Sequence, residues 1–206
     1  MPKVADSTIR RLSLYLRFLE EFEEHGTATV SSEALASRGG TTSAQVRKDL
    51  SFFGSFGKRG LGYRVPELAG RLRQILGLGG RYRVALIGAG KIGSALYQHH
   101  GFRDRGFDVV AIFDRDPVKI GEVWNGVPVA DVATLEAVLD GQPVDIAILV
   151  TPAEATQDIA DRLVRLGVKA ILNFAPVQLN VPHEVAVKTV NLVLELEALS
   201  YSLTSR

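Results

Sequence analysis

A glycine-rich segment near the middle of the chain has the residue types and spacing of a phosphate-binding turn. It reads Gly88, Ala89, Gly90, Lys91, Ile92, Gly93, and it follows an apolar run at residues 84–87. In a dinucleotide-binding turn, the first glycine permits a tight bend, the second lets the backbone approach a pyrophosphate, and the third lets the next helix pack on the strand. Free N–H groups at the helix N-terminus then bind the phosphates. We expect residues 88–93 to bind a dinucleotide, although the same glycines could serve only a strand-to-helix turn.

An acidic residue follows at a distance that suits a ribose contact. A second predicted strand, residues 108–113, ends at Asp114, which lies 26 positions after Gly88. A carboxylate there accepts hydrogen bonds from the hydroxyl groups of the adenosine ribose and repels a 2′-phosphate. Asp114 therefore predicts NAD(H) rather than NADP(H), and the neighbouring Arg115 weakens that preference.

The composition argues against several other kinds of reactive centre. The chain has no cysteine, which excludes disulfides, thiolate metal ligands and a cysteine nucleophile. Its histidines lack the spacing of a metal site; they are His25, His99, His100 and His183. The N-terminus lacks the apolar core of a signal peptide, and no apolar run approaches the ~20 residues that span a bilayer. We expect a cytoplasmic protein with no metal and no membrane contact.

A second candidate site is a polar, basic helix near the N-terminus. In residues 41–54, apolar side chains at helical spacing face a core, and the opposite face carries the side chains that we expect to contact DNA: Ser43, Gln45, Arg47, Lys48 and Ser51. Arginine and lysine reach guanine edges or phosphates, and glutamine or serine reaches bases or the sugar-phosphate backbone. A capped helix at residues 31–36 and a glycine pair at 39–40 complete a helix-turn-helix. Taken alone, the pattern also fits a solvated charged helix.

The residues after this helix predict a wing. Four glycines between residues 54 and 62 surround Lys58 and Arg59, and an alternating segment at 63–65 follows. We interpret residues 54–65 as a β-hairpin whose tip, Lys58, Arg59 and Gly60, contacts the DNA backbone or minor groove. A recognition helix followed by a wing favours a winged-helix DNA-binding domain over a solvated helix.

The distribution of charge divides the chain near residue 80. Residues 1–80 hold 12 Lys and Arg against 8 Asp and Glu, whereas the whole chain has a net charge of only +1, so the remainder is mildly acidic. A basic module suits a polyanionic partner. We expect residues 1–80 to form the DNA-binding domain, with further helices at 8–24 and 66–76 and a short linker at 77–80.

The rest of the chain alternates strands and helices. We expect strands near residues 127–129, 144–150, 169–174 and 185–190, and helices near 134–139 and 153–166. This alternation predicts an α/β fold with a doubly wound parallel sheet, a Rossmann domain over residues 81–190.

Two further features of this domain bear on function. Ligands of doubly wound sheets bind beyond the carboxyl ends of the strands. Residues at those ends are the candidates for the nicotinamide half of the site: Thr151, Pro152, Asn173, Phe174, Ala175 and Pro176. Phe174 could equally belong to the core. We expect an apolar helix in residues 191–206, which could fold onto its own sheet but which we expect to pack on a second subunit.

These motifs together resemble the Rex family of bacterial redox-sensing transcriptional repressors. The resemblance rests on four segments and covers nearly the whole chain: residues 45–54, 57–63, 88–93 and 173–176. It implies a homodimer with an N-terminal winged helix, a Rossmann domain that binds NAD(H) as a regulatory ligand, and a last helix exchanged between protomers. It further implies a repressor, not an enzyme, that binds palindromic operator DNA when NADH is scarce and leaves it when NADH rises.

The chain departs from the family pattern at two positions. Members often carry a tyrosine where this chain has His99, and an acidic residue where it has Asn191. Both positions bear on how the two redox states are distinguished.

Two other interpretations of the glycine motif remain. One is a small NAD-dependent oxidoreductase, but only about 126 residues follow residue 80, enough for a cofactor-binding fold alone, and no catalytic set is visible. The other is a CoA-binding Rossmann protein, which Asp114 and the DNA-binding module argue against.

Overall fold

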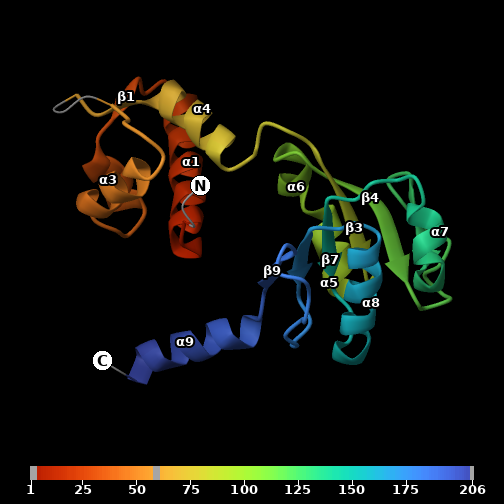
Figure 1. The fold of residues 1–206 in the computed structure, drawn as a ribbon. Helices are drawn as coiled ribbons and strands as arrows, with labels where there is room; N and C mark the ends of the chain where they lie inside the picture. The colour runs from red at the N-terminus through yellow and green to blue at the C-terminus, as the bar shows by residue number, and fades with distance from the viewer. Residues whose placement is uncertain (1–3, 58–60, 205–206) are drawn as a thin grey trace. The chain divides into compact units, whose positions relative to one another are not determined.

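The chain forms two compact units, residues 1–80 and residues 81–206 (Figure 1). The structure is a computed structural model that describes residues 4–57 and 61–204. Each unit has a hydrophobic core of its own, and each is described separately below.

The first unit is a small bundle of helices with a two-stranded sheet. Its buried core joins residues from all four helices, among them Leu12, Leu35, Val46 and Leu72. The N-termini of the two central helices are capped as their sequences predict: the Ser31 hydroxyl accepts from the Ala34 N–H, and the Thr42 hydroxyl accepts from the Gln45 N–H. The elements are α1 (Asp6–Glu24), β1 (Thr29–Val30), α2 (Ser32–Arg38), α3 (Ser43–Ser51), β2 (Tyr63–Arg64) and α4 (Val65–Ile75).

The strand pairing in this unit corrects the prediction of a hairpin within residues 54–65. Strand β2 pairs antiparallel with β1, Val30 opposite Tyr63, and residues 54–57 form no strand. Val30 and Tyr63 are both buried in the core, whereas the glycines before β2 offer no side chain to bury. Gly57 and Gly62 also have positive φ angles of 72° and 75°, which bend the backbone away from an extended strand.

A buried carboxylate fastens α3 to α1. Asp49 of α3 has no exposed side-chain surface, and Arg11 of α1 binds it with two nitrogens, Nε at 2.6 Å and Nη2 at 2.7 Å. The Tyr15 hydroxyl donates to Asp49 at 3.0 Å, and the Gln45 amide donates at 2.8 Å. A buried charge is tolerated only when it is paired and hydrogen-bonded, and Asp49 meets both conditions.

Ionisation of these groups follows from the same contacts. Burial acts to raise the pKa of Asp49, but hydrogen bonds from Arg11, Gln45 and Tyr15 outweigh burial and lower that pKa below its ordinary value. Burial and the bond to Asp49 raise the pKa of Tyr15 to about 12. The pair is therefore a carboxylate with a neutral phenol at neutral pH.

The second unit is a seven-stranded sheet with the order β5-β6-β4-β3-β7-β8-β9. All neighbours are parallel except β5 and β6, and the six parallel strands have the 3-2-1-4-5-6 order of a Rossmann fold. The predicted α/β doubly wound fold is thereby confirmed. The strands are β3 (Tyr82–Ile87), β4 (Phe107–Asp114), β5 (Val123–Trp124), β6 (Val127–Asp131), β7 (Ile146–Leu149), β8 (Ala170–Asn173) and β9 (Ala186–Thr189).

The two faces of the sheet have separate cores, because alternate side chains of a strand point to opposite faces. Ile87 and Leu149 belong to one core, which also contains residues of α8, whereas Leu86 and Ile148 belong to the other. The helical elements of this unit are α5 (Lys91–Gln98), α6 (His100–Asp104), η1 (Val132–Thr134), α7 (Leu135–Leu139), α8 (Ala153–Arg165) and α9 (Leu192–Thr204).

Part of the second face is left as an open apolar groove of about 270 Å³. Both connections that follow β7 pack into the first core, α8 through Ile159 and the β8–β9 loop through Leu179. Neither of them therefore covers this half of the second face. Ile146, Ile148 and Leu172 line the groove.

The last helix, α9, buries none of its residues. Five of its leucines and Tyr201 are about 60% exposed or more. The Asn191 side chain caps this helix, because its Oδ1 accepts from the Val193 N–H at 3.0 Å. Within the described residues, no helix is both long and apolar enough to cross a bilayer.

The buried ion pair gives a prediction about stability. We expect Arg11→Met to lower the free energy of unfolding of the first unit by about 3 kcal/mol, because it leaves the Asp49 carboxylate buried without a cation. Urea unfolding followed by circular dichroism measures the loss. Arg10→Met is the matched control, since Arg10 is an exposed neighbour on the same helix, and equal effects of the two changes would contradict the role assigned to Arg11.

Candidate functional site

The register of the sheet brings the predicted nucleotide-binding residues to one edge. Ile87 pairs with Phe113 on one side and with Leu149 on the other. The residues that follow these strands therefore meet at the carboxyl edge. A cleft of about 560 Å³ opens there, a volume within the range of small-ligand sites. Its lining includes Gly88, Gly90, Asp114, Arg115, Thr151 and Pro152.

The absence of a side chain has a different structural reason at each glycine of the turn. Gly88 has a φ of 107°, and a Cβ there would lie 2.5 Å from the Val150 carbonyl oxygen. A Cβ on Gly93 would lie 1.9 Å from the Gly88 oxygen, so α5 packs directly on the turn. Gly90 differs from both, because only Lys119 Nζ, at 3.9 Å, lies within 4 Å of a Cβ built there. The space at Gly90 is the space that a ligand would enter.

The N-terminus of α5 is open to an anion. Gly90 is its N-cap residue and offers no side chain to accept from the first-turn amides. Lys91 and Ile92 are exposed in that first turn, while Ala89 is buried beneath it. Unpaired N–H groups at a helix N-terminus favour phosphate.

Asp114 lies in the cleft and binds the turn itself. Its Oδ2 accepts from the Ala89 N–H at 2.6 Å, and its Oδ1 accepts from the N–H groups of Arg115 and Asp116 at 2.7 and 2.9 Å. This carboxylate therefore fixes the position of the glycine turn relative to β4. A ribose hydroxyl that reaches Asp114 would donate to the lone pairs of the carboxylate oxygens that the three backbone N–H groups do not occupy.

Sequence reasoning missed Lys119. It follows β4 in a turn at residues 116–121, and its Nζ donates to the Ala89 carbonyl at 3.0 Å and lies 3.9 Å from Asp114 Oδ2. Lys119 adds positive charge beside the open N-terminus of α5. The turn looked like an ordinary loop in the sequence, and only the contact with Ala89 identifies this lysine.

The structure does not bring residues 173–176 into this cleft. Asn173 is buried, and its side chain binds its own loop: Oδ1 accepts from the Ala175 N–H, and Nδ2 donates to the Ala175 and Val177 carbonyls. Phe174 packs against the second core, Ala175 is buried and Pro176 is exposed. In this arrangement Asn173 stabilises the loop after β8, and the geometry gives it no free polar atom for a ligand.

Five of the predicted DNA-contacting residues lie on α3, but their side chains differ in exposure and in hydrogen bonding. Lys48 and Arg47 are exposed on α3, and Ser43 is partly exposed in its first turn. The Ser51 hydroxyl donates to the Lys48 carbonyl at 2.7 Å. Gln45 is partly exposed, and its amide nitrogen is held by Asp49 at 2.8 Å.

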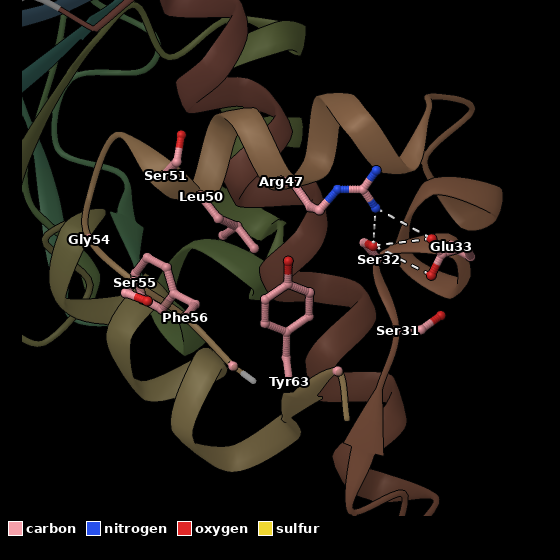
Figure 2. Close-up of a pocket in the computed structure, with 12 residues that line it drawn as sticks. Ser31, Ser32, Glu33, Arg47, Leu50, Ser51, Gly54, Ser55, Phe56 and Tyr63 are labelled. Atoms are coloured by element: carbon pink, nitrogen blue, oxygen red, sulfur yellow. Dashed lines mark hydrogen bonds and ion pairs between the residues drawn. The ribbon is translucent and has the colours of Figure 1, made fainter. Parts of the chain in front are cut away.

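Arg47 has partners on the neighbouring helix. Its Nη1 donates to Ser32 Oγ at 2.9 Å and to Glu33 Oε1 at 3.4 Å (Figure 2). The pKa of Glu33 is lowered by its own backbone N–H and then by the Ser31 hydroxyl, so Glu33 is ionised near neutral pH. The predicted wing-tip residues Lys58, Arg59 and Gly60 lie outside the described residues.

Sequence reasoning also missed the burial of Asp49, although the sequence held a signal for it. Val46, Asp49, Leu50 and Phe53 share one helical face, so an acidic residue stands among core positions. Arg11 stands in the same way on the apolar face of α1. An unmatched acid and an unmatched base on two packed faces predict an ion pair.

A helix-turn-helix unit joined to a Rossmann sheet with an open glycine turn defines a class: DNA-binding proteins that carry a dinucleotide-type ligand domain. Comparisons with known proteins agree. The family model described as "Putative DNA-binding protein N-terminus" matches residues 3–51, and the model described as "CoA binding domain" matches residues 80–177.

Full-length relatives make the assignment specific. The redox-sensing transcriptional repressor Rex of Carboxydothermus hydrogenoformans is 48% identical over 98% of this chain and 97% of its own. The crystal structure of RSP in complex with beta-NAD+ and operator DNA is 41% identical, has a TM-score of 0.93, and is matched over 100% of this chain and 94% of that chain. RSP in complex with beta-NADH is 40% identical, with a TM-score of 0.89 over 100% and 96% of the two chains. This chain belongs to the Rex family.

The glycines of the turn allow stability and binding to be tested apart. We expect Gly93→Ala to destabilise the second unit by about 1–3 kcal/mol, because its Cβ would overlap the Gly88 oxygen. Gly90→Ala should leave stability almost unchanged but weaken dinucleotide binding, because the methyl group enters the ligand space. Thermal unfolding and NADH titration measure the two effects, and tight binding by the Gly90 variant would show that the ligand lies elsewhere.

Proposed function

We propose that this protein is a homodimeric repressor that binds palindromic operator DNA in the cytoplasm and is released from it by NADH. The observation that carries this proposal is the match along the whole chain to a Rex-family fold solved with NAD+, with NADH and with operator DNA. In this proposal residues 1–80 bind DNA, residues 81–190 bind NAD(H), and residues 191–206 form the dimerisation helix.

The nucleotide site is proposed from the cleft at the carboxyl edge of the sheet. The pyrophosphate lies against Gly90 and the first-turn amides of α5, with Lys119 supplying a nearby positive charge. Asp114 faces the adenosine ribose, and Thr151 and Pro152 lie at the end of the neighbouring strand. A carboxylate at this position favours NAD(H) over NADP(H), while Arg115 opposes that preference.

The DNA-binding surface is proposed to be the exposed face of α3. Arg47 and Lys48 supply charge for base edges and phosphates, and the helix begins with the small polar Ser43. In a two-fold dimer, two such helices bind half-sites about 34–36 Å apart. The wing residues Lys58 and Arg59 are proposed to contact the flanking backbone.

The dimer is proposed from α9 and the open groove of the sheet. A helix that exposes five leucines, and a groove lined by Ile146, Ile148 and Leu172, are complementary apolar surfaces in one chain. Exchange of α9 between two protomers buries both surfaces at once, and a two-fold interface of this kind closes on itself.

Redox sensing needs a difference in ligand affinity between two arrangements of the dimer. NADH must bind more tightly to the arrangement that cannot hold DNA than to the arrangement that can. A ligand that binds both arrangements equally well does not shift the equilibrium between them. Oxidised nicotinamide carries a positive charge, which loses more solvation in an apolar pocket than the neutral reduced ring does. An apolar pocket would therefore favour NADH over NAD+ in the released state. His99 and Asn191 stand at positions that bear on this selectivity.

A regulatory role is proposed in place of an enzymatic one, because the full-length relatives are named as repressors. The runner-up ligand is CoA, since the family model that matches the Rossmann unit is described as a CoA binding domain. An oxidoreductase would consume NADH with a substrate, which a sensor does not.

The proposal is tested by release of DNA. Fluorescence anisotropy of a labelled operator, selected by the protein from a random DNA pool, follows protein binding and then titration with NADH, NAD+, NADPH and CoA at fixed salt. We expect release by micromolar NADH and much weaker effects of the other three. Release by CoA alone would favour the runner-up, and DNA binding that no nucleotide changes would contradict redox sensing.

The dimer interface gives a separate prediction. The double substitution Leu196→Glu and Leu199→Glu should convert the dimer to a monomer, because both side chains are exposed in one chain and the proposed exchange would bury them. Sedimentation velocity measures the change. Val118→Glu adds a charge at an exposed apolar residue outside α9 and is the control; a double variant that still dimerises would exclude these leucines from the interface.

A further inference from the structure

Arg47 is held at one end by two residues of the preceding helix. Its Nη1 donates to Ser32 Oγ at 2.9 Å and lies 3.4 Å from Glu33 Oε1, as the dashed lines in Figure 2 show. Ser32 is only 8% exposed, so its hydroxyl is a fixed acceptor. The Ser32 hydroxyl in turn lies 3.4 Å from both Glu33 carboxylate oxygens, to which it can donate.

The two helices that carry these residues are rigidly packed together. Leu35 of α2 and Val46 of α3 are fully buried in the same core, and both helices have capped N-termini. The contact therefore places the guanidinium relative to the backbone of α3.

One edge of the guanidinium remains free. Nε and Nη2 of Arg47 have no hydrogen-bond partner among the residues that the structure describes, and Figure 2 shows the second terminal nitrogen pointing away from Ser32 and Glu33. These two nitrogens carry parallel N–H groups, a fork that matches the O6 and N7 acceptors of guanine.

The charge of Glu33 bears on what that fork can bind. Its carboxylate lies beside the guanidinium and offsets part of its positive charge, which weakens attraction to phosphate. A guanine edge is uncharged and needs geometry more than charge. Lys48, which forms no ion pair with a carboxylate among the residues that the structure describes, remains suited to phosphate.

We propose that Ser32 and Glu33 are positioning residues that set base specificity, because they hold Arg47 with its free edge turned to read a guanine in the major groove. The proposal rests on the proposed operator-binding function and deepens it. Arginine is flexible, and holding it before DNA arrives reduces the ordering that recognition requires. The base-reading unit then spans α2 and α3.

The test measures guanine recognition rather than affinity alone. In an operator selected by the unmodified protein, each guanine is replaced in turn by 7-deazaguanine, which lacks only the N7 acceptor. We expect one guanine in each half-site at which the replacement weakens binding about 10-fold. This penalty should vanish in Arg47→Ala and fall to about 3-fold or less in Ser32→Ala and Glu33→Gln. The affinity of these last two variants for non-specific DNA should be no weaker than that of the unmodified protein.

Further variants separate positioning from general damage. Ser32→Thr keeps the hydroxyl and should keep the penalty, and Ser32→Ala should have no added effect on it in an Arg47→Ala background. Glu67→Gln is the matched control, since Glu67 is an exposed carboxylate paired with Arg64 at 2.6 Å in the same unit. It should leave the penalty intact, and NADH binding should be unchanged in every variant.

Two results would overturn the proposal. A full penalty in both Ser32→Ala and Glu33→Gln would show that Arg47 reads guanine without support. A penalty that survives Arg47→Ala would show that another residue reads the base. Failure of the unmodified protein to select any DNA is a different outcome, which would refute the proposed function itself.

Discussion

The carboxylate of Asp49 constrains the whole N-terminal unit. A charge without exposed surface needs its partners in place, and those partners come from α1 through Arg11 and Tyr15 and from α3 itself through Gln45. Helices α1 and α3 are consequently locked in one relative orientation, and α2 packs against both with Leu35 in the shared core. The contacts of Asp49 therefore also determine the direction in which the exposed face of α3, with Arg47 and Lys48, points. A polar interaction in the interior thus determines which side chains the surface can present.

The second unit depends on a geometrical constraint instead. Parallel pairing of β3 with β4 and β7 brings the ends of three strands to one edge, and there the turn at Gly88 must pass under the backbone at Val150. Asp114 fixes this turn by accepting from the Ala89 N–H. The open helix N-terminus is therefore a result of sheet register and close backbone contact, and a side chain at Gly88 or Gly93 would disturb it.

Local signals in the sequence were enough to predict much of this architecture. The glycine turn, the longer helices of both units and the order of the main strands follow from spacing and periodicity, and these are confirmed with small shifts at element ends. The short elements β1, β5 and α6 were not predicted. The features that were missed depend on residues far apart in the chain. Strand β2 pairs with β1 across more than thirty residues, Lys119 reaches back to Ala89, and Asn173 turns inward to its own loop. Periodicity shows which face of an element is buried but does not name its partner. The pairing of Asp49 with Arg11 could have been suspected, because each is a charge on an apolar face.

The terminal helix has a consequence for how the protein behaves at different abundances. On the pairing proposed above, each chain finishes burying its apolar surface only in the presence of another chain. Folding and assembly are then one equilibrium, so mass action makes the unfolding temperature rise with protein concentration. A cell that makes few copies would hold a larger fraction of incomplete protomers with exposed leucines. The level of expression would thus set the stability of the protein as well as its amount.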